Sequence, residues 1–339
     1  MTRPAGMGKR SVWAWLRMLG GAGILGVLVW RLGSGAFLDG LRRIDAPTLL
    51  SALVLGLLTT VFSAWRWCLV ARGLGLRLPL GRAVADYYRA LFLNAALPGG
   101  VLGDVHRAVR HGRSAGDLGR GVRAVVLERT AGQVVLLVAG TAVLLLRPSP
   151  ALAQAGRLLG TPAGWVSAAV VASAAIAVAY WSRGASRAAR AVRTALAEAR
   201  RALFARASWP GVTLSSVVVL AGYLAMFVLA ARVAGVSAPV AELVPLVVLA
   251  LLAMALPLNV GGWGPREGVA AWAFGAAGLG AAQGLASAVV YGVLAFAASL
   301  PGAGVLVVRW AAGLRARRAA DTAAAEPAPT LAEEAGRGA

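Results

Sequence analysis

The sequence predicts an all-α protein, a polytopic membrane helical bundle, and three observations lead to this prediction. Of the 339 residues, 59% are hydrophobic, and the mean hydropathy is +0.74. The apolar residues form runs that can span a hydrocarbon core, which needs about 20 residues of helix. The net charge of +21 is carried mainly by residues between these runs. A soluble nucleic-acid-binding domain with this charge would be far more polar, so we expect no nucleic-acid partner.

Six apolar runs are long enough for full spans. In chain order they are Trp13 to Trp30, Pro47 to Val70, Val122 to Leu146, Pro162 to Trp181, Gly211 to Val233 and Gln283 to Trp310. The first run follows a basic segment and could also be a cleaved signal peptide. We interpret it as an uncleaved anchor, because Arg17 lies after the run has begun at Val12 and no small-residue cleavage site follows.

Two further apolar segments are too short or too interrupted for a full span. Residues 82–102 contain Asp86 and Arg89 before a Pro-Gly-Gly sequence, and residues 243–258 stop at a Gly-rich loop that a short apolar piece, 269–278, follows. We expect both segments to be re-entrant or oblique. The alternative, two full spans, gives eight helices and reverses every loop between them.

The cations indicate the orientation, because short cytoplasmic loops of membrane proteins are rich in Lys and Arg. With the amino terminus inside and both short segments re-entrant, 24 cations lie inside, six lie outside and four lie within membrane segments. Those four are Arg66, Arg89, Arg129 and Arg266. The split predicts that both termini are cytoplasmic.

The membrane domain is predicted to cover residues 1–318 and to include a basic connector at residues 182–210. Apolar residues recur at helical spacing in this connector, which fits an amphipathic helix on an anionic leaflet or, equally, a solvated basic linker. From residue 319 to 339 the composition turns to Ala, Pro, Thr and Glu, and we expect a disordered tail.

The two short segments share one pattern: an apolar half-helix, a Pro and an Asn near its end, a Gly-Gly pair, a further Gly and a charged helix start. The first contains Asn94, Pro98, Gly99, Gly100, Gly103, Asp104 and Arg107, and the second contains Pro257, Asn259, Gly261, Gly262, Gly264, Arg266 and Glu267. Gly permits close backbone approach and Pro ends a helix, so both loops should be unwound at membrane depth. Such backbone is tolerated where it is buried in protein or lines a wet cavity.

The helix starts after these loops favour an anionic ligand. Asp104 is predicted to cap one helix, and Pro265 to occupy the first position of the other, with Glu267 in its first turn. Free N–H groups at helix N-termini attract anions. Because one loop enters from each side, the segments are placed as in inverted repeats that meet at a central substrate site.

Charged residues within the predicted spans are a second indication of a central substrate site. A charge facing lipid at the bilayer centre costs roughly 2.5–3.5 kcal/mol or more, so we expect these charges to face the interior and to pair. Glu128 is expected to pair with an Arg of the short segments, and Asp104 with Arg129. Arg66 has a Trp on either side, and in an alternative interpretation it snorkels to the inner interface.

No catalytic residue, metal site or cofactor is predicted. His106 and His111 lack partners at metal-ligand spacing, and Cys68 is the only Cys, so no internal disulfide forms. The Gly-rich runs follow apolar helices rather than strands, which excludes the common nucleotide-binding motifs. In an alternative, three carboxylates act as acid or base in a membrane transferase. They are Asp104, Glu128 and Glu267.

Several motifs occur in order along the chain. They are Arg66-Trp67, Asn94 with Leu97-Pro98-Gly99-Gly100, Gly103-Asp104 with Arg107, Glu128-Arg129 followed by Gly132, and Pro257 with Gly261-Gly262-Trp263-Gly264 and Arg266-Glu267-Gly268. In combination they resemble the transmembrane, flippase-like family of lysylphosphatidylglycerol synthases. The resemblance runs from about residue 10 to residue 312.

The resemblance implies an integral protein of the inner (cytoplasmic) membrane, whose fused relatives make aminoacylated phosphatidylglycerol and move it between leaflets. In those relatives a separate soluble domain transfers the aminoacyl group. We expect this chain to lack that domain and not to be an enzyme. The implied function is transport of an anionic lipid, either a phospholipid or a polyprenyl-phosphate-linked lipid. The alternative is a membrane-embedded transferase or an accessory subunit in cell-envelope biogenesis.

The expected partners are membrane lipids with anionic headgroups, together with a second copy of the chain or an envelope-biosynthesis enzyme. The predicted substrate-binding residues come from the two short segments and the charged positions of the spans. They are Arg66, Arg89, Asn94, Pro98, Gly99, Gly100, Gly103, Asp104, Arg107, Glu128, Arg129, Asn259, Gly261, Gly262, Gly264, Arg266 and Glu267.

Overall fold

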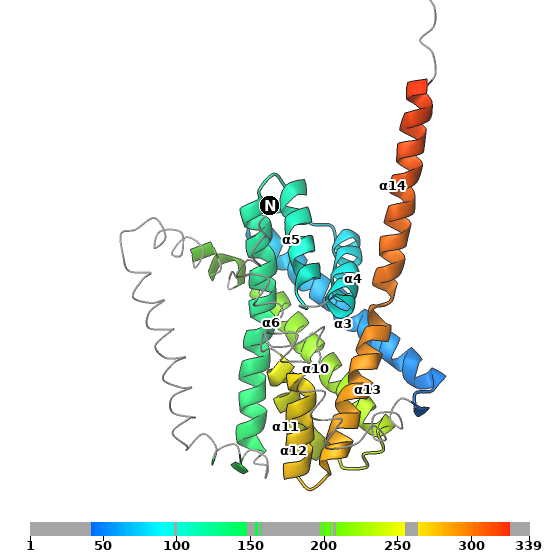
Figure 1. Ribbon diagram of the computed structural model, residues 1–339. Helices are drawn as coiled ribbons and strands as arrows, with labels where there is room; N and C mark the ends of the chain where they lie inside the picture. The colour runs from blue at the N-terminus through cyan, green and yellow to red at the C-terminus, as the bar shows by residue number, and fades with distance from the viewer. Residues whose placement is uncertain are drawn as a thin grey trace, which may run out of the picture.

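The computed structural model describes residues 42–97, 100–147, 208–254 and 264–325, with short pieces between residues 153 and 205. Over these residues the chain forms helices and no strand (Figure 1). The helices are α3 (Ala46–Gly73), α4 (Leu80–Ala96), α5 (Leu102–Ser114), α6 (Leu118–Leu146), α10 (Trp209–Val233), α11 (Val240–Met254), α12 (Pro265–Ala276), α13 (Ala281–Ser299) and α14 (Pro301–Ala325). The predicted all-α bundle is confirmed.

Four stretches of the described chain are long and apolar enough to cross a membrane, namely α3, α6, α10 and the stretch Ala281–Arg315. They match four of the six predicted spans, and the other two lie outside the described residues. Side-chain caps define where two of them begin. Asp45 accepts a hydrogen bond from the Thr48 amide at 2.9 Å before α3, and Asp117 accepts one from the Arg120 amide at 2.9 Å before α6.

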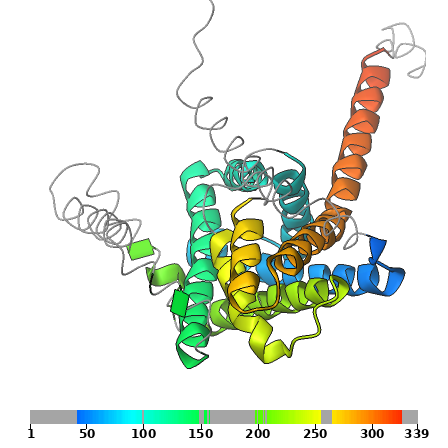
Figure 2. The ribbon, with the colours of Figure 1, turned by 60° about the horizontal axis from the view of Figure 1, so that its bottom comes forward.

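The last predicted span consists of two helices, α13 and α14, which meet at Leu300. Pro301 has no N–H to donate and its ring crowds the preceding turn, which explains the break. Figure 1 and Figure 2 show α14 projecting beyond the other helices. The helix continues to Ala325, so the prediction of disorder from residue 319 onward is wrong for its first residues, where several alanines favour helix.

The connector is described only near its carboxyl end, where it packs on the bundle. Ala202 is buried against Gly73 at the end of α3, where an added Cβ would lie 2.7 Å from the Ala202 Cα atom. Glu198 pairs with Arg123 of α6 at 2.6 Å. The rest of the connector lies outside the described residues.

The first short segment is a hairpin of two helices, α4 and α5. At its closed end the Gly103 amide donates to Asn94 Oδ1 at 2.7 Å, and toward its open end Arg110 Nε lies 3.9 Å from Asp86 Oδ1. These contacts require α5 to run back along α4. The segment therefore returns to the side of the bundle from which it enters.

The second short segment, α11 and α12, is a hairpin of the same kind. Arg266 Nη1 lies 3.8 Å from the Met254 sulfur near the closed end, and Leu243 and Leu246 share a buried cluster with Phe274 toward the open end. In Figure 1 the α4–α5 hairpin lies near one end of the molecule and the α11–α12 hairpin near the other. The two hairpins thus enter the bundle from opposite sides.

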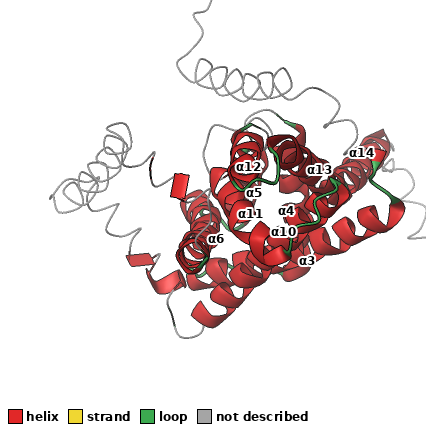
Figure 3. Cartoon of the chain, turned by 90° about the horizontal axis from the view of Figure 1, so that it is seen from below, coloured by secondary structure: helices red, strands yellow, loops and turns green. Residues whose placement is uncertain are grey.

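The order of elements repeats with inverted direction. Helices α3, α4, α5 and α6 correspond to α10, α11, α12 and α13, so each half is a span, a hairpin and a second span. α3 packs on α10, while α6 packs against α11 and α4 against α13. Figure 3 shows α6 and α14 on opposite sides of the bundle. This is the arrangement predicted for two inverted repeats.

The first hairpin depends on the absence of a side chain at Gly103, because a Cβ there would collide with the backbone of Ala90. We expect Gly103→Ala to destabilise the protein by about 1–3 kcal/mol, the usual cost of overpacking. Thermal unfolding of the purified protein in detergent measures the effect. Gly81→Ala on α4 is the control, because a Cβ there meets nothing within 4 Å. Equal unfolding midpoints for the two variants would contradict the close packing.

Candidate functional site

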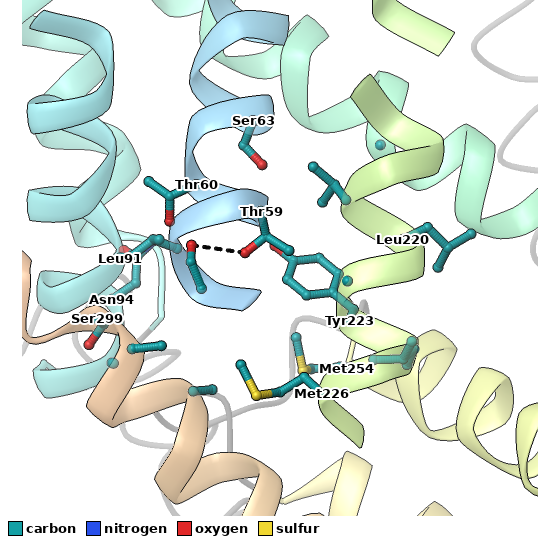
Figure 4. Close-up of a pocket in the computed structure, with 18 of the residues that line it drawn as sticks. Thr59, Thr60, Ser63, Leu91, Asn94, Leu220, Tyr223, Met226, Met254 and Ser299 are labelled. Atoms are coloured by element: carbon teal, nitrogen blue, oxygen red, sulfur yellow. Dashed lines mark hydrogen bonds between the residues drawn. The ribbon is translucent and has the colours of Figure 1, made fainter. Parts of the chain in front are cut away.

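A cavity of about 440 Å³ lies between the two halves of the bundle. Its wall is amphipathic. Figure 4 shows the side chains of Thr59 and Ser63 on α3 and the ring of Tyr223 on α10 at the space between these helices, with Met226 and Met254 below. Ser63 Oγ is buried and has no hydrogen-bond partner within the described residues, so it can bind a ligand.

Three guanidinium groups line the cavity, and they come from both halves of the chain. They are those of Arg66 on α3, Arg129 on α6 and Arg266 on α12. None of the lining residues in the described part of the chain is acidic. The carboxylates that pair with these cations lie behind the wall, so the wall itself presents positive charge.

Glu128 is the centre of the first group of buried charges and is completely buried. Its Oε1 accepts hydrogen bonds from Arg66 Nη2 at 2.6 Å and from the Tyr87 hydroxyl at 3.2 Å, and its Oε2 accepts one from Arg107 Nη2 at 2.6 Å. Arg66 also donates to Ser216 Oγ at 3.1 Å. One carboxylate therefore joins α3, α4, α5 and α6, and through Arg66 it reaches α10.

Two aromatic rings hold Arg107 in place. Its Cζ atom lies 4.7 Å from the centroid of the Trp67 ring and 4.5 Å from that of the Tyr87 ring, and its Nε donates to Asp104 Oδ1 at 2.8 Å. Cation–π contacts of a desolvated guanidinium are worth about 2 kcal/mol. The first hairpin is thereby locked to α3 as well as to α6.

Asp104 connects this network to the cavity. It pairs with Arg129, as predicted, and accepts a hydrogen bond from Asn94 Nδ2 at 2.9 Å. The prediction that Asp104 caps α5 is wrong, because the helix begins at Leu102 and Asp104 lies in its first turn. Asn94 Oδ1 instead accepts the hydrogen bond of the Gly103 amide.

The predicted pairing of Glu128 is also present, since Arg107 belongs to the first short segment. The alternative in which Arg66 snorkels to the interface is wrong. Only 4% of Arg66 is exposed, and its guanidinium points inward to Glu128.

The second half contains a smaller group of the same type. Glu267, fully buried in the first turn of α12, pairs with Arg266 and accepts a hydrogen bond from the Gly264 amide at 2.6 Å. Pro265 occupies the first helical position, as predicted. Gly264 has φ +119°, a conformation that favours glycine. The Arg266 guanidinium lies 4.9 Å from the centroid of the Tyr291 ring.

The structure divides the predicted site residues into four groups. Arg66, Asn94, Gly100, Arg129 and Arg266 line the cavity. Gly103, Asp104, Arg107, Glu128, Gly264 and Glu267 support the wall from behind. Pro98, Gly99, Asn259, Gly261 and Gly262 lie outside the described residues. Arg89 does not line the cavity and pairs with Asp86, so its assignment to the central site is wrong.

Four aromatic residues that line the cavity or contact its arginine network were not predicted as site residues. They are Trp67, Tyr87, Tyr223 and Tyr291. No motif marks the three tyrosines, because an aromatic residue in an apolar helix is ordinarily a packing residue. Trp67 follows Arg66 in the sequence, and only the packing of α5 shows that its ring contacts Arg107 rather than lipid.

The two histidines do not form a metal site with other described residues, among which no group of three His, Cys, Asp or Glu side chains could hold a metal ion. His111 packs edge-on against Trp67, with ring centroids 5.4 Å apart. Burial lowers the pKa of His111, so its imidazole is neutral at pH 7.

Comparison with known protein families places most of the chain in one of them. Residues 14–302 match the family model described as "Lysylphosphatidylglycerol synthase TM region". No curated protein and no solved structure matches the chain. The matched range contains both hairpins and all three cations of the cavity wall. This multi-pass membrane protein therefore belongs to the lysylphosphatidylglycerol synthase transmembrane-region family.

Proposed function

We propose that the protein moves an anionic lipid between the leaflets of a cell membrane, with the headgroup in the central cavity and the acyl or prenyl chains in the bilayer. The observation that carries this proposal is the charge arrangement of the wall, with three guanidinium groups at the surface and their carboxylates behind it. Such a wall attracts a phosphate. The hydroxyls of Thr59, Ser63 and Tyr223 provide further hydrogen bonds.

The N-termini of two helices beside the cavity also favour an anionic headgroup. α5 and α12 begin beside the cavity, and Gly100 just before α5 belongs to the wall. Helix N-termini favour anions through their free N–H groups and the helix dipole. Because the hairpins come from opposite sides, one helix N-terminus approaches the headgroup from each side.

The inverted arrangement supports movement across the bilayer. In transporters built from inverted repeats, the two halves exchange conformations around a fixed central site. Opening along the α4–α5 hairpin would expose the headgroup to one side, and opening along the α11–α12 hairpin to the other. We place the substrate among phospholipids and polyprenyl-phosphate-linked lipids, and the α4–α5 end on the cytoplasmic side.

The carboxylates support transport over a membrane transferase. A general base needs a carboxylate that is free to take a proton. Glu128 and Glu267 are each held by arginine at hydrogen-bond distance and are completely buried. We therefore propose that they hold the wall in place and take no part in chemistry.

The test is lipid translocation in liposomes that contain the purified protein. We expect faster movement of headgroup-labelled phosphatidylglycerol or polyprenyl phosphate than in empty liposomes. Arg129→Gln should slow this movement about 10–100-fold, because a hydrogen bond to a charged group is worth about 1.5–3 kcal/mol. The fold should survive, since the Arg129 side chain is 44% exposed and Asp104 keeps Arg107 as a partner.

Arg113→Gln is the matched control, because it removes the same charge from an exposed position of α5 outside the cavity. We expect wild-type translocation for this variant. No acceleration with either lipid, or equal rates for the Arg129 and Arg113 variants, would contradict the proposal.

A further inference from the structure

A second group of charged side chains lies outside the central cavity, between α4, α5 and α14. At its centre is Asp86, of which 3% is exposed. Asp86 Oδ1 lies 2.6 Å from Arg309 Nη1, 3.3 Å from Arg89 Nη2 and 3.9 Å from Arg110 Nε. Three guanidinium groups thus converge on one carboxylate oxygen. None of these four residues lines the central cavity.

The charges in this group do not balance. Among the residues that the structure describes, one carboxylate faces three arginines, which leaves two positive charges in excess. Buried charge normally requires a partner, because desolvation of an unpaired ion costs several kcal/mol. Arg110 and Arg309 are partly exposed, so the excess positive charge of the group is available to an anion that approaches from outside.

Arg89 is the buried member of the group that has donors left for an anion. It is 4% exposed, and neither its Nε nor its Nη2 atom has a hydrogen-bond partner within the described residues. Nη2 lies within ion-pair distance of Asp86 but lacks the alignment of a hydrogen bond. A buried guanidinium with two unsatisfied donors is rare, because unpaired buried donors are costly.

The group is reachable from outside. The Arg110 side chain is 36% exposed and the Arg309 side chain 29% exposed, while Arg89 lies beneath them. Next to Arg309, Val308 and Trp310 on α14 are each 69% exposed, as expected of a surface that contacts lipid. An anion that approaches along α14 can therefore contact Arg309 and Arg110 at the surface and Arg89 below them.

We propose that Arg89, Arg110 and Arg309 form a second anion site, separate from the transport cavity, that binds a phosphoryl group. Guanidinium groups suit this ligand because their planar donors match phosphate oxygens in pairs. Asp86 is the internal counter-charge, and the phosphoryl group competes with its carboxylate for the three arginines. The phosphoryl group belongs either to the headgroup of an anionic lipid beside α14 or to a free phosphate compound.

The test is binding of defined probes to the full chain, which requires no transport. For the free anion, inorganic pyrophosphate is titrated against the protein in phosphatidylcholine nanodiscs, and binding is measured by calorimetry. For the lipid, native mass spectrometry counts the phosphatidic acid molecules retained by the protein. Saturable binding of pyrophosphate to the protein would identify a free phosphate compound as the ligand. Retention of phosphatidic acid without pyrophosphate binding would identify a lipid headgroup.

The variants distinguish this site from the central cavity. Arg89→Gln and Arg309→Gln should each weaken binding of the identified probe by about 10–100-fold, as expected for loss of a charged hydrogen bond. Arg315→Gln, on the exposed part of α14, is the matched control and should bind like the wild type. Asp86→Asn should bind more tightly, because it removes the competing carboxylate.

The opposite effects of the Asp86 and Arg89 variants make the proposal falsifiable even where one variant folds poorly. Equal binding by wild type, Arg89→Gln and Arg309→Gln would overturn it. Weaker binding by a folded Asp86→Asn would overturn it as well, since it would mean that the carboxylate takes part in binding. Absence of binding by both probes would also overturn it.

Discussion

Glu128→Gln is expected to lower the free energy of unfolding by about 3–5 kcal/mol, the cost of leaving a buried charge without its partner. Gln keeps the shape of Glu but removes the charge that neutralises Arg66 and Arg107. Arg107 is buried behind the cavity wall, where water cannot replace the lost carboxylate, and Arg66 is only 4% exposed. The unfolding midpoint of the detergent-purified protein, followed by size-exclusion chromatography after heating, measures the loss.

The control is Glu242→Gln in the first turn of α11, where the side chain is exposed. Exposed substitutions change stability by about 0.5 kcal/mol or less, so its midpoint should stay near that of the wild type. A Glu128→Gln protein as stable as the control would mean that the buried ion pairs do not hold the first half of the bundle together.

Arg266→Met is the second substitution with a large expected effect. It leaves Glu267 buried without its cation, which should again cost about 3–5 kcal/mol. The double variant Arg266→Met/Glu267→Gln should regain most of this stability. Gln can still accept the hydrogen bond of the Gly264 amide, and no unpaired charge is left by the substitution.

Translocation in liposomes separates the structural role of Arg266 from its role in the cavity wall. The double variant should fold like the wild type but move lipid slowly, because the second half no longer presents a cation to the cavity. A double variant with wild-type stability and wild-type translocation would show that Arg266 serves the fold alone.

Much of the architecture could be predicted from the sequence, because length and hydropathy directly limit what can cross a bilayer. The spans at α3, α6 and α10 match the predicted runs closely, and the Gly and Pro residues of the short segments correctly indicated two interrupted elements. The pair Asp104–Arg129 was predictable because few acidic residues are available to partner an intramembrane arginine.

The positions of Arg89 and the tyrosines could not be predicted. Helical periodicity indicates that two residues share a face, but it does not say which helix packs on that face. Arg89 and Asp86 lie on one face of α4. Only the structure shows that α14 packs on this face, so that Asp86 pairs with Arg309 and neither residue reaches the cavity. The break at Leu300 was missed because the apolar run continues through Pro301.

In the proposed transport, the carboxylates behind the cavity wall would also determine how readily a bound headgroup leaves the cavity. Each wall cation already pairs with a carboxylate, so an arriving phosphate would compete with that carboxylate and would not meet a bare charge. On release the carboxylate would regain its cation, which would offset part of the cost of losing the phosphate. A cavity lined by unpaired cations would hold its substrate tightly, whereas the paired cations of this wall would favour repeated turnover in the proposed transport.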